Sequence, residues 1–178
     1  MIAVSLTGCR GENKELDRMM SFRASLLASL GCSFQASITA DYQEVLYTFK
    51  LQCQSDDQGN IMFAVIEPET IAGISGRITA QGGELTFDDQ GLAFELLADG
   101  QLSPVSAPWV LIKALRGGYV SSCGLEENQL CASIRDSYEY DALKTQIWFD
   151  DQDLPGYGEI LWDNRKILSV EISNFEIL

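Results

Sequence analysis

Two runs of alternating residues determine the fold of this chain, CSFQASITA at positions 32–40 and VLYTFKLQC at positions 45–53. The even positions of the first run are apolar, and so are the odd positions of the second run. A period of two is typical of β-strands with one buried face. The two runs therefore predict an antiparallel hairpin around residues 41–44, with an apolar face formed by both strands.

One register of this hairpin matches five pairs of residues at once. The predicted pairs are Ala40–Val45, Ile38–Tyr47, Ala36–Phe49, Phe34–Leu51 and Cys32–Cys53. Directly opposed residues in a hairpin have Cβ atoms about 4.5–5.5 Å apart, which is close to disulfide reach. We therefore expect a Cys32–Cys53 bond worth roughly 3 kcal/mol. The alternative is that both cysteines are reduced and buried.

The strand pattern continues on both sides of a later apolar segment. Strands are expected at 60–67, 71–80, 84–87 and 92–96, and again at 119–123, 130–136, 143–149, 157–163 and 167–177. Residues 60–67 have apolar side chains on both faces of the predicted strand, which predicts that other parts of the protein cover both faces. The segments DDQG at 56–59 and 88–91 and DDQD at 150–153 predict turns. None of them matches a calcium-binding loop, so no metal site is predicted.

Two helices are predicted among these strands. Residues 14–30 have apolar side chains at helical spacing, with Asn13 as the N-cap and Gly31 as the stop. A second helix begins near Ser106, has Pro108 in its first turn and runs to residues 117–118. It is apolar almost all round, which is typical of a helix that is buried in a core or lies as a lid over something apolar.

The order of these elements is a helix, about six strands, a helix and about five strands. It predicts an α+β domain with one large antiparallel sheet, which must curl, split or close. This order, and the ending with Leu154-Pro155, Glu159-Ile160 and LSVEISNF at 168–175, resembles the LolA-like family of bacterial lipoprotein carriers and lipid-binding envelope lipoproteins. The resemblance implies a single domain over residues 14–178, an incomplete β-barrel whose two helices cover the concave face. It also implies that the apolar interior takes acyl chains.

The start of the chain resembles a bacterial lipobox, Leu6-Thr7-Gly8-Cys9, between an apolar run and the polar segment RGENK. In this interpretation residues 1–8 are the remnant of a signal peptide, Cys9 carries an acyl group such as palmitate, and residues 9–13 form a tether. The apolar run is shorter than a full signal peptide requires. The interpretation predicts a lipid-anchored protein of the cell membrane that faces outside the cytoplasm. The alternative is a cytosolic start with a chance match.

The remaining cysteines are even in number once Cys9 is set aside, as expected for disulfides outside the cytoplasm. Cys123 and Cys131 lie symmetrically about a turn at residues 126–128, so we expect that they could face each other in a second bond. The alternative again is that the thiols stay reduced.

Composition excludes several classes of function. The chain has 178 residues, 26 of them acidic and 12 basic, and a net charge of −14, which argues against nucleic-acid binding and against charge-driven docking on anionic lipid. It contains no histidine, which removes histidine-dependent nucleophile systems and histidine zinc sites. It also lacks a Ser-x-x-Lys pair, a Gly-x-Ser-x-Gly elbow and a phosphate-binding loop. We therefore predict no enzymatic activity, no catalytic residues and no cofactor.

Two functions remain. The first is a membrane-tethered protein that binds a lipid or another apolar or amphipathic molecule in the half-barrel. The candidate lining residues are Phe34, Ile38, Tyr47, Phe49, Trp109 and Ile112. The alternative is that these side chains fill a solid core, and that the protein holds an envelope protein partner through a sheet edge or an acidic face. A cavity of several hundred Å³ would favour the first function.

Overall fold

The computed structural model describes residues 13–41, 46–87, 90–94, 97–98, 101–137 and 143–178. The predicted lipobox, Cys9 and most of the tether lie outside these residues. The helices and strands are α1 (Lys14–Ala28), β1 (Gly31–Asp41), β2 (Leu46–Asp56), β3 (Ile61–Glu67), β4 (Ser75–Thr79), β5 (Gly82–Phe87), β6 (Gln90–Phe94), β7 (Leu97–Ala98), β8 (Gln101–Leu102), α2 (Ala107–Gly117), β9 (Tyr119–Glu126), β10 (Gln129–Arg135), β11 (Lys144–Phe149), β12 (Pro155–Trp162) and β13 (Arg165–Ile177).

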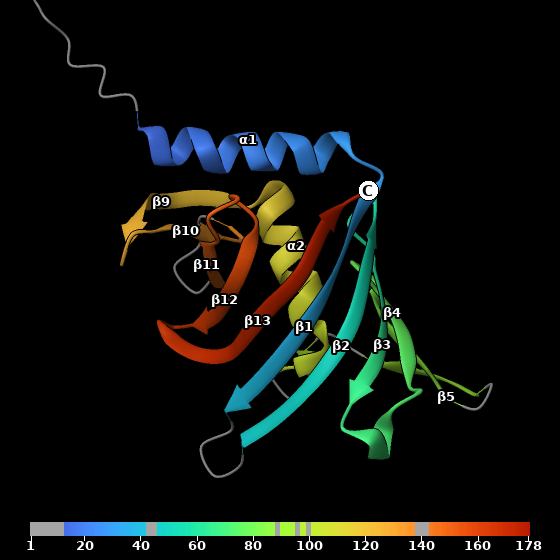
Figure 1. Ribbon diagram of the computed structural model, residues 1–178. Coiled ribbons are helices and arrows are strands. Elements are labelled where there is room, and N and C mark those ends of the chain that lie inside the picture. Colours follow the sequence, from blue (N-terminus) through green and yellow to red (C-terminus); the bar gives the residue numbers. More distant parts are fainter. Residues whose placement is uncertain (1–12, 42–45, 88–89, 95–96, 99–100, 138–142) are drawn as a thin grey trace, which may run out of the picture.

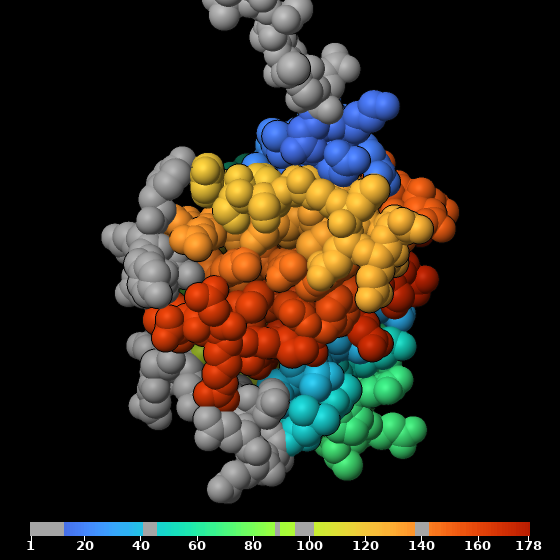
Figure 2. All heavy atoms as spheres, turned by 90° about the vertical axis from the view of Figure 1, so that its left-hand side faces the viewer, coloured from blue at the N-terminus to red at the C-terminus, as the bar shows by residue number. Residues whose placement is uncertain are grey.

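Eleven of these strands form one antiparallel sheet in the order β6-β5-β4-β3-β2-β1-β13-β12-β11-β10-β9. The sheet is curved and open, with β6 and β9 at its two edges. Helix α2 lies on its inner side, and α1 lies across one end of it (Figure 1). In Figure 2 the strands β9 to β13 follow one another below α1. The predicted fold class, a large curved antiparallel sheet with an N-terminal and a mid-chain helix, is confirmed. What the sequence did not predict is that β1 pairs with β13, which joins the first and last strands in the middle of the sheet.

The predicted β1–β2 hairpin is present, but its register is two residues away from the expected one. Phe34 lies opposite Cys53, and Cys32 lies opposite Ser55. A shift of two residues leaves every side chain on its predicted face, because side chains along a strand alternate with a period of two. The alternation therefore predicts the face correctly and cannot distinguish these two registers.

The structure also corrects the prediction for β3, which is buried on one face only. Ile61, Phe63 and Val65 point into the core, whereas Met62 and Ile66 on the other face are 51% and 36% exposed. The apolar outer face of β3 is therefore a surface feature and not a second packed layer.

Helix α1 packs across one end of the sheet through its buried side chains Met19, Phe22 and Leu26. As predicted, Asn13 is the N-cap, and its side chain accepts a hydrogen bond of 3.2 Å from the Leu16 backbone N–H. The ring of Phe22 contacts Phe149 and Phe175 at centroid distances of 5.4 and 5.8 Å. The helix ends two residues earlier than predicted.

Two arginines connect the helices, because each donates hydrogen bonds to carbonyl oxygens at the C-terminal end of the other helix. Arg23 of α1 donates to the carbonyl oxygens of Leu115 and Ala114 of α2, at 2.6 and 3.1 Å. Arg116 of α2 donates to the carbonyl oxygen of Leu26 of α1 at 3.3 Å. A cation at a helix C-terminus also interacts favourably with the helix dipole. These bonds hold α1 and α2 in one relative position.

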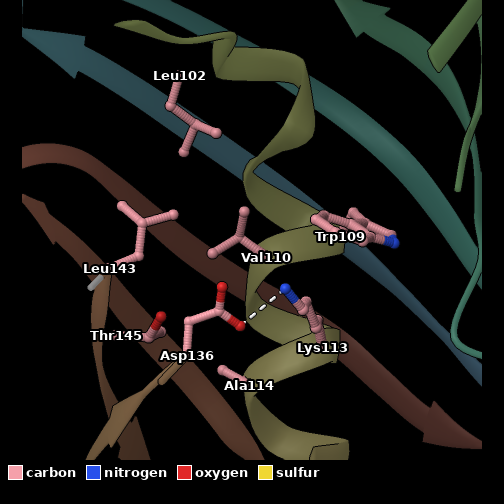
Figure 3. Close-up of a pocket in the computed structure, with 8 residues that line it drawn as sticks. All are labelled: Leu102, Trp109, Val110, Lys113, Ala114, Asp136, Leu143 and Thr145. Carbon is pink, nitrogen blue, oxygen red and sulfur yellow. Dashed lines mark ion pairs between the residues drawn. The ribbon is translucent and has the colours of Figure 1, made fainter. Parts of the chain in front are cut away.

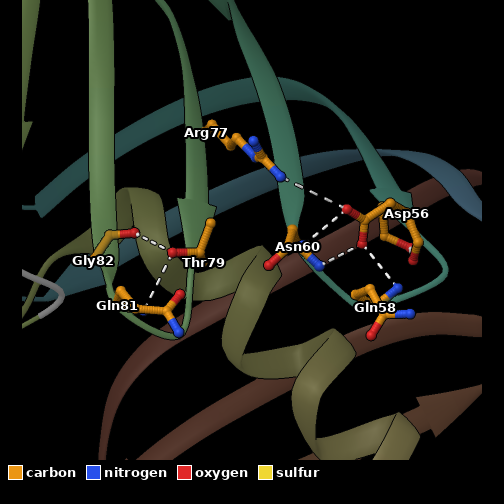
Figure 4. A network of polar contacts seen from close by, with 8 residues as sticks. Asp56, Gln58, Asn60, Arg77, Thr79, Gln81 and Gly82 are labelled. Carbon is orange, nitrogen blue, oxygen red and sulfur yellow. Dashed lines mark hydrogen bonds and ion pairs between the residues drawn. The ribbon is translucent and has the colours of Figure 1, made fainter.

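Two of the predicted aspartate turns use their first carboxylate in the same way. Asp56 accepts hydrogen bonds from the backbone N–H groups of Gln58 and Asn60 and from the Asn60 side chain, at 3.0, 2.9 and 2.8 Å (Figure 4). Asp150 accepts from the backbone N–H groups of Gln152 and Leu154 at 2.8 and 3.0 Å. These carboxylates therefore hold closed two of the turns that the sequence predicted. Residues 88–89 of the third segment lie outside the described residues.

Replacement of Asp56 by Ala is expected to lower the free energy of unfolding by about 1 kcal/mol at pH 7, a value discounted because the group is partly exposed. Burial alone would raise the pKa of this carboxyl, but the bonds from Asn60 and Gln58 and the charge of Arg77 together lower it. A lowered folded-state pKa means that the stabilisation is present above the unfolded pKa of about 3.9 and is lost as the pH falls through the folded value. Urea unfolding of the natural chain and of the variant from pH 7 to pH 2.5 measures this.

The matched control is Asp57→Ala, which removes the neighbouring, exposed carboxylate. We expect it to change the free energy of unfolding little at any pH. Equal losses in the two variants would contradict the role assigned to Asp56.

Candidate functional site

Helix α2 occupies the concave face of the sheet, where the sequence placed a ligand. Its residues Leu111, Ile112 and Leu115 are at most 1% exposed, and α2 packs against β10 to β13. Gly158 of β12 makes room for Leu111, because a Cβ atom at Gly158 would lie 2.8 Å from Leu111 Cδ2. Much of the interior of the half-barrel is therefore filled by the protein's own helix.

The six predicted lining residues differ in their surroundings. Phe34, Ile38 and Ile112 are buried in the core at 0–1% exposure. The remaining three differ: Phe49 is partly buried against the core, Tyr47 is 54% exposed, and Trp109 lines a pocket. That these residues contact a ligand stays a prediction.

The pocket at Trp109 lies between α2 and the strands β10 and β11 and has a volume of about 160 Å³ (Figure 3). Its lining residues are Leu102, Trp109, Val110, Lys113, Ala114, Asp136, Leu143 and Thr145. Lys113 Nζ lies 2.7 Å from Asp136 Oδ1 and 5.1 Å from the centre of the Trp109 ring. The pocket therefore combines apolar walls with one ion pair, and it is smaller than the 300–1,000 Å³ typical of ligand sites.

The sequence analysis identified Trp109 but missed Lys113 and Asp136. Lys113 lies four residues after Trp109, so it is a neighbour on the same side of the helix and could have been identified from spacing. Asp136 follows β10 and reaches the pocket only because β10 packs beside α2. No pattern in the sequence points to that contact.

At the β6 end of the sheet, the face that continues the core is apolar and partly exposed. We call Leu85, Phe87, Leu92 and Phe94 the β5–β6 apolar patch. Leu85 lies opposite Leu92, and Gly83 lies opposite Phe94, so the four side chains share one face. Phe87 and Leu92 are 52% and 66% exposed.

The opposite face of the same strands is polar and hollowed. One hollow of about 280 Å³ is lined partly by Met62, Ser75 and Thr86, and a shallow one of about 780 Å³ partly by Thr79 and Gln81. Both hollows include Arg77 and Glu84, which lie opposite each other on β4 and β5. The β4–β6 end of the sheet therefore presents a polar face and an apolar face to solvent.

Strand β6 is also an open edge. Within the described residues, no further strand of the sheet pairs with its outer side. At the other end of the sheet, α1 packs against β9. Edge strands of natural proteins are commonly blunted by charged residues or proline, but β6 has the uncharged sequence QGLAF. The backbone of β6 is therefore suited to pair with another strand.

The second predicted cysteine pair is placed differently from the expectation. Cys123 lies opposite Ala132, and Cys131 lies opposite Gly124. The expected register was wrong by one residue, because the hairpin closes with a two-residue turn at Glu127–Asn128 in which both φ angles are positive. A shift of one residue turns a side chain to the other face of the sheet, so Cys123 and Cys131 point away from each other.

Cys32 and Cys53 share a face as diagonal neighbours and not as an opposed pair. Cys32 Sγ lies 3.3 Å from Ser55 Oγ. All four described cysteines are free thiols in the structure, so the two predicted disulfides are not present in it.

Thiol counting in a Cys9→Ser chain is expected to find four free thiols after unfolding. Burial raises the pKa of Cys32, Cys53 and Cys123, and it raises the pKa of Cys131 to about 11. Because the thiolate is the reactive form, iodoacetamide at pH 8 should modify the folded protein slowly. Mass spectrometry with and without denaturant measures both. A count of two after unfolding, rising to four with reductant, would show that one pair is oxidised.

The described residues contain no helix that is long and apolar enough to cross a membrane. In the same part of the chain, no group of three or more Cys, Asp or Glu side chains could hold a metal ion.

No family model matches the sequence, and a search of curated proteins found no match. Among solved structures, a LolA superfamily protein from Nitrosomonas europaea is similar over 92% of this chain and 93% of its own, with 8% identity and a TM-score of 0.46. Lipoprotein LppX from Mycobacterium tuberculosis matches 92% of this chain and 96% of its own, with 8% identity and a TM-score of 0.46. A chain from the complex of the CwlD amidase and the GerS lipoprotein of Clostridioides difficile matches 97% of this chain and 100% of its own, with 13% identity and a TM-score of 0.45. The likeness is one of fold alone.

Proposed function

We propose that this chain is an extracytoplasmic lipoprotein, held at the membrane by acylated Cys9, that binds a protein partner along β6. The observation that carries the proposal is the contrast between the two parts of the concave face. Helix α2 fills one part, whereas the β5–β6 apolar patch is partly exposed at an open edge.

The partner is a protein with an extended segment that adds a strand to β6. An added strand gains main-chain hydrogen bonds from the edge, and its alternate side chains pack on the exposed face of the sheet. Here that face offers Phe87 and Leu92. Asp88, Asp89 and Glu95 flank β6 in the sequence, so a segment with basic residues at its ends is favoured.

Site-specific photo-crosslinking in the cells that make the protein tests this proposal. A benzophenone amino acid replaces Leu92 of β6 in one variant and Leu46 at the start of β2 in the other, and both positions are 66% exposed. We expect a discrete adduct from position 92 and none from position 46. Introducing Leu92→Lys while the probe is at Phe87 should abolish the adduct, because a lysine blunts the edge.

Mass spectrometry of the adduct identifies the partner. An adduct with a second copy of the chain would show that β6 mediates self-association and would contradict the proposal of a different protein as the partner. Equal adducts from both positions, or none from position 92, would overturn the proposal.

A small apolar ligand in the pocket at Trp109 is the second candidate, which the apolar walls of that pocket favour. Its limited volume suits a short chain and not a whole lipid. Hexanoate and hexanol titrations, read by the indole N–H signal of Trp109 in NMR spectra, test it. A saturable shift of this signal supports the candidate, and an unchanged signal with both probes excludes it.

A further inference from the structure

We propose that the solvent side of α1 lies on the membrane surface and sets the orientation of the domain there. We call Met20, Ala24, Leu27 and Ala28 the outer face of α1. This proposal rests on the proposed acylation of Cys9, and its occupant is a lipid surface.

The outer face is apolar although nothing in the described structure covers it. Met20 and Leu27 are 44% and 50% exposed, and Ala24 and Ala28 are exposed as well. At about 100° per residue these four positions fall on one side of the helix, opposite the buried side chains. Leu30, just past the end of α1, is 79% exposed and adds to the exposed apolar surface at this end of the molecule.

The position of α1 in the fold makes this face available to a flat surface. The helix lies across one end of the molecule, and the C-terminus lies beside its far end (Figure 1). There the backbone N–H of Leu30 donates to the carbonyl oxygen of Leu178 at 3.1 Å. Arg23 binds the end of α2, and Arg18 pairs with Asp153, so the helix cannot easily turn its apolar side inward.

The distribution of charge points the same way. The chain has 26 acidic residues, but residues 18–40 contain none. Anionic lipid repels acidic protein surfaces, so the molecule can approach a membrane best through a face without carboxylates. Asp17 is exposed one turn before Met20 on the same side of α1, which limits the contact to the part of the helix after it.

The short tether favours lipid as the surface that the outer face of α1 contacts, because it keeps α1 close to the membrane. Three residues separate Cys9 from Asn13, so an acylated Cys9 lies at most about 14 Å from the first residue of the described chain. Helix α1 has 15 residues and is about 22 Å long, which is longer than the tether. A short tether gives an effective concentration in the millimolar range, so a face too small to bind lipid by itself can still rest on it.

Quenching of a new tryptophan by brominated lipid tests the proposal on the full-length, acylated protein in phosphatidylcholine–phosphatidylglycerol vesicles. Leu27→Trp places the probe on the outer face. Leu46→Trp is the matched control, because residue 46 lies at the other end of the β1–β2 hairpin, about 33 Å along the strands. We expect a loss and a blue shift of emission for Leu27→Trp and no change for Leu46→Trp.

High salt should leave the loss of emission unchanged, because apolar contact and not charge attraction holds the face. Flotation of the same samples reports the anchor separately. Protein that floats with vesicles while Leu27→Trp stays unquenched overturns the docking of α1 and leaves the anchor intact. Protein that does not float, with an unmodified mass at Cys9, overturns the anchor and this proposal with it. Quenching that requires an added envelope protein would assign the outer face to a protein partner instead.

Discussion

Replacement of Gly31 by Ala is expected to lower the free energy of unfolding by about 3–5 kcal/mol and the melting temperature by about 10 °C. Gly31 opens β1 with a φ of +141°, a conformation that residues with a Cβ atom rarely adopt. A Cβ atom at this position would lie 2.0 Å from the carbonyl oxygen of Ser55 and 2.9 Å from its carbonyl carbon. Because these are backbone atoms in the paired strand β2, the clash can be relieved only by moving the hairpin.

The control is Gly124→Ala in β9, where φ is not positive and an added Cβ atom has no neighbour within 4 Å. We expect that variant to unfold within about 0.5 kcal/mol of the natural chain. Thermal and urea unfolding followed by circular dichroism measures both variants. Similar losses at the two glycines would refute the steric role of Gly31.

Truncation of Phe34 to Ala is expected to cost about 3–5 kcal/mol of stability. Phe34 is 1% exposed, and its ring stacks on Phe175 with a centroid distance of 5.6 Å. Phe175 in turn contacts Phe22, so a row of rings connects β1, β13 and α1. The cavity left by the truncation would lie where α1 is held to the sheet.

This substitution also separates the two explanations for the predicted lining residues. A side chain that packs a solid core loses stability when truncated, whereas one that lines a ligand cavity loses ligand affinity at a smaller cost in stability. The matched variant is Tyr47→Ala, which removes another predicted lining residue, now 54% exposed, and should cost less than about 1 kcal/mol. Urea unfolding gives both values. A small loss for Phe34→Ala would favour a cavity at this position.

Local chemistry made much of the fold predictable. Asn13 caps α1, and Pro108 lies in the first turn of α2, because these residues suit helix starts in any context. Asp56 and Asp150 close their turns for a similar reason, since a short carboxylate reaches its own following backbone N–H groups. Such contacts span a few residues and need no knowledge of the rest of the chain.

Registers were less predictable than faces. The β1–β2 register differed by two residues and kept its faces, whereas the β9–β10 register differed by one residue and exchanged them. The second error came from the length of the turn, because the alternation of the flanking strands does not reveal whether the turn has two residues or three. The outer face of β3 shows the same limit, because an apolar pattern does not say whether a covering layer exists.

The sequence by itself determined the order of the two helices and of the eleven strands of the large sheet, the inward face of the β1–β2 hairpin and the apolar character of α2. These properties depend on periodicity and capping, which act over one or two turns of a helix or a few residues of a strand. Only the tertiary structure decided that β1 pairs with β13, that α2 fills the concave face beside Gly158, and that β6 is left as an uncharged edge. Those outcomes depend on contacts between residues that lie from tens to more than one hundred positions apart, or on which surfaces are left uncovered when all layers have packed.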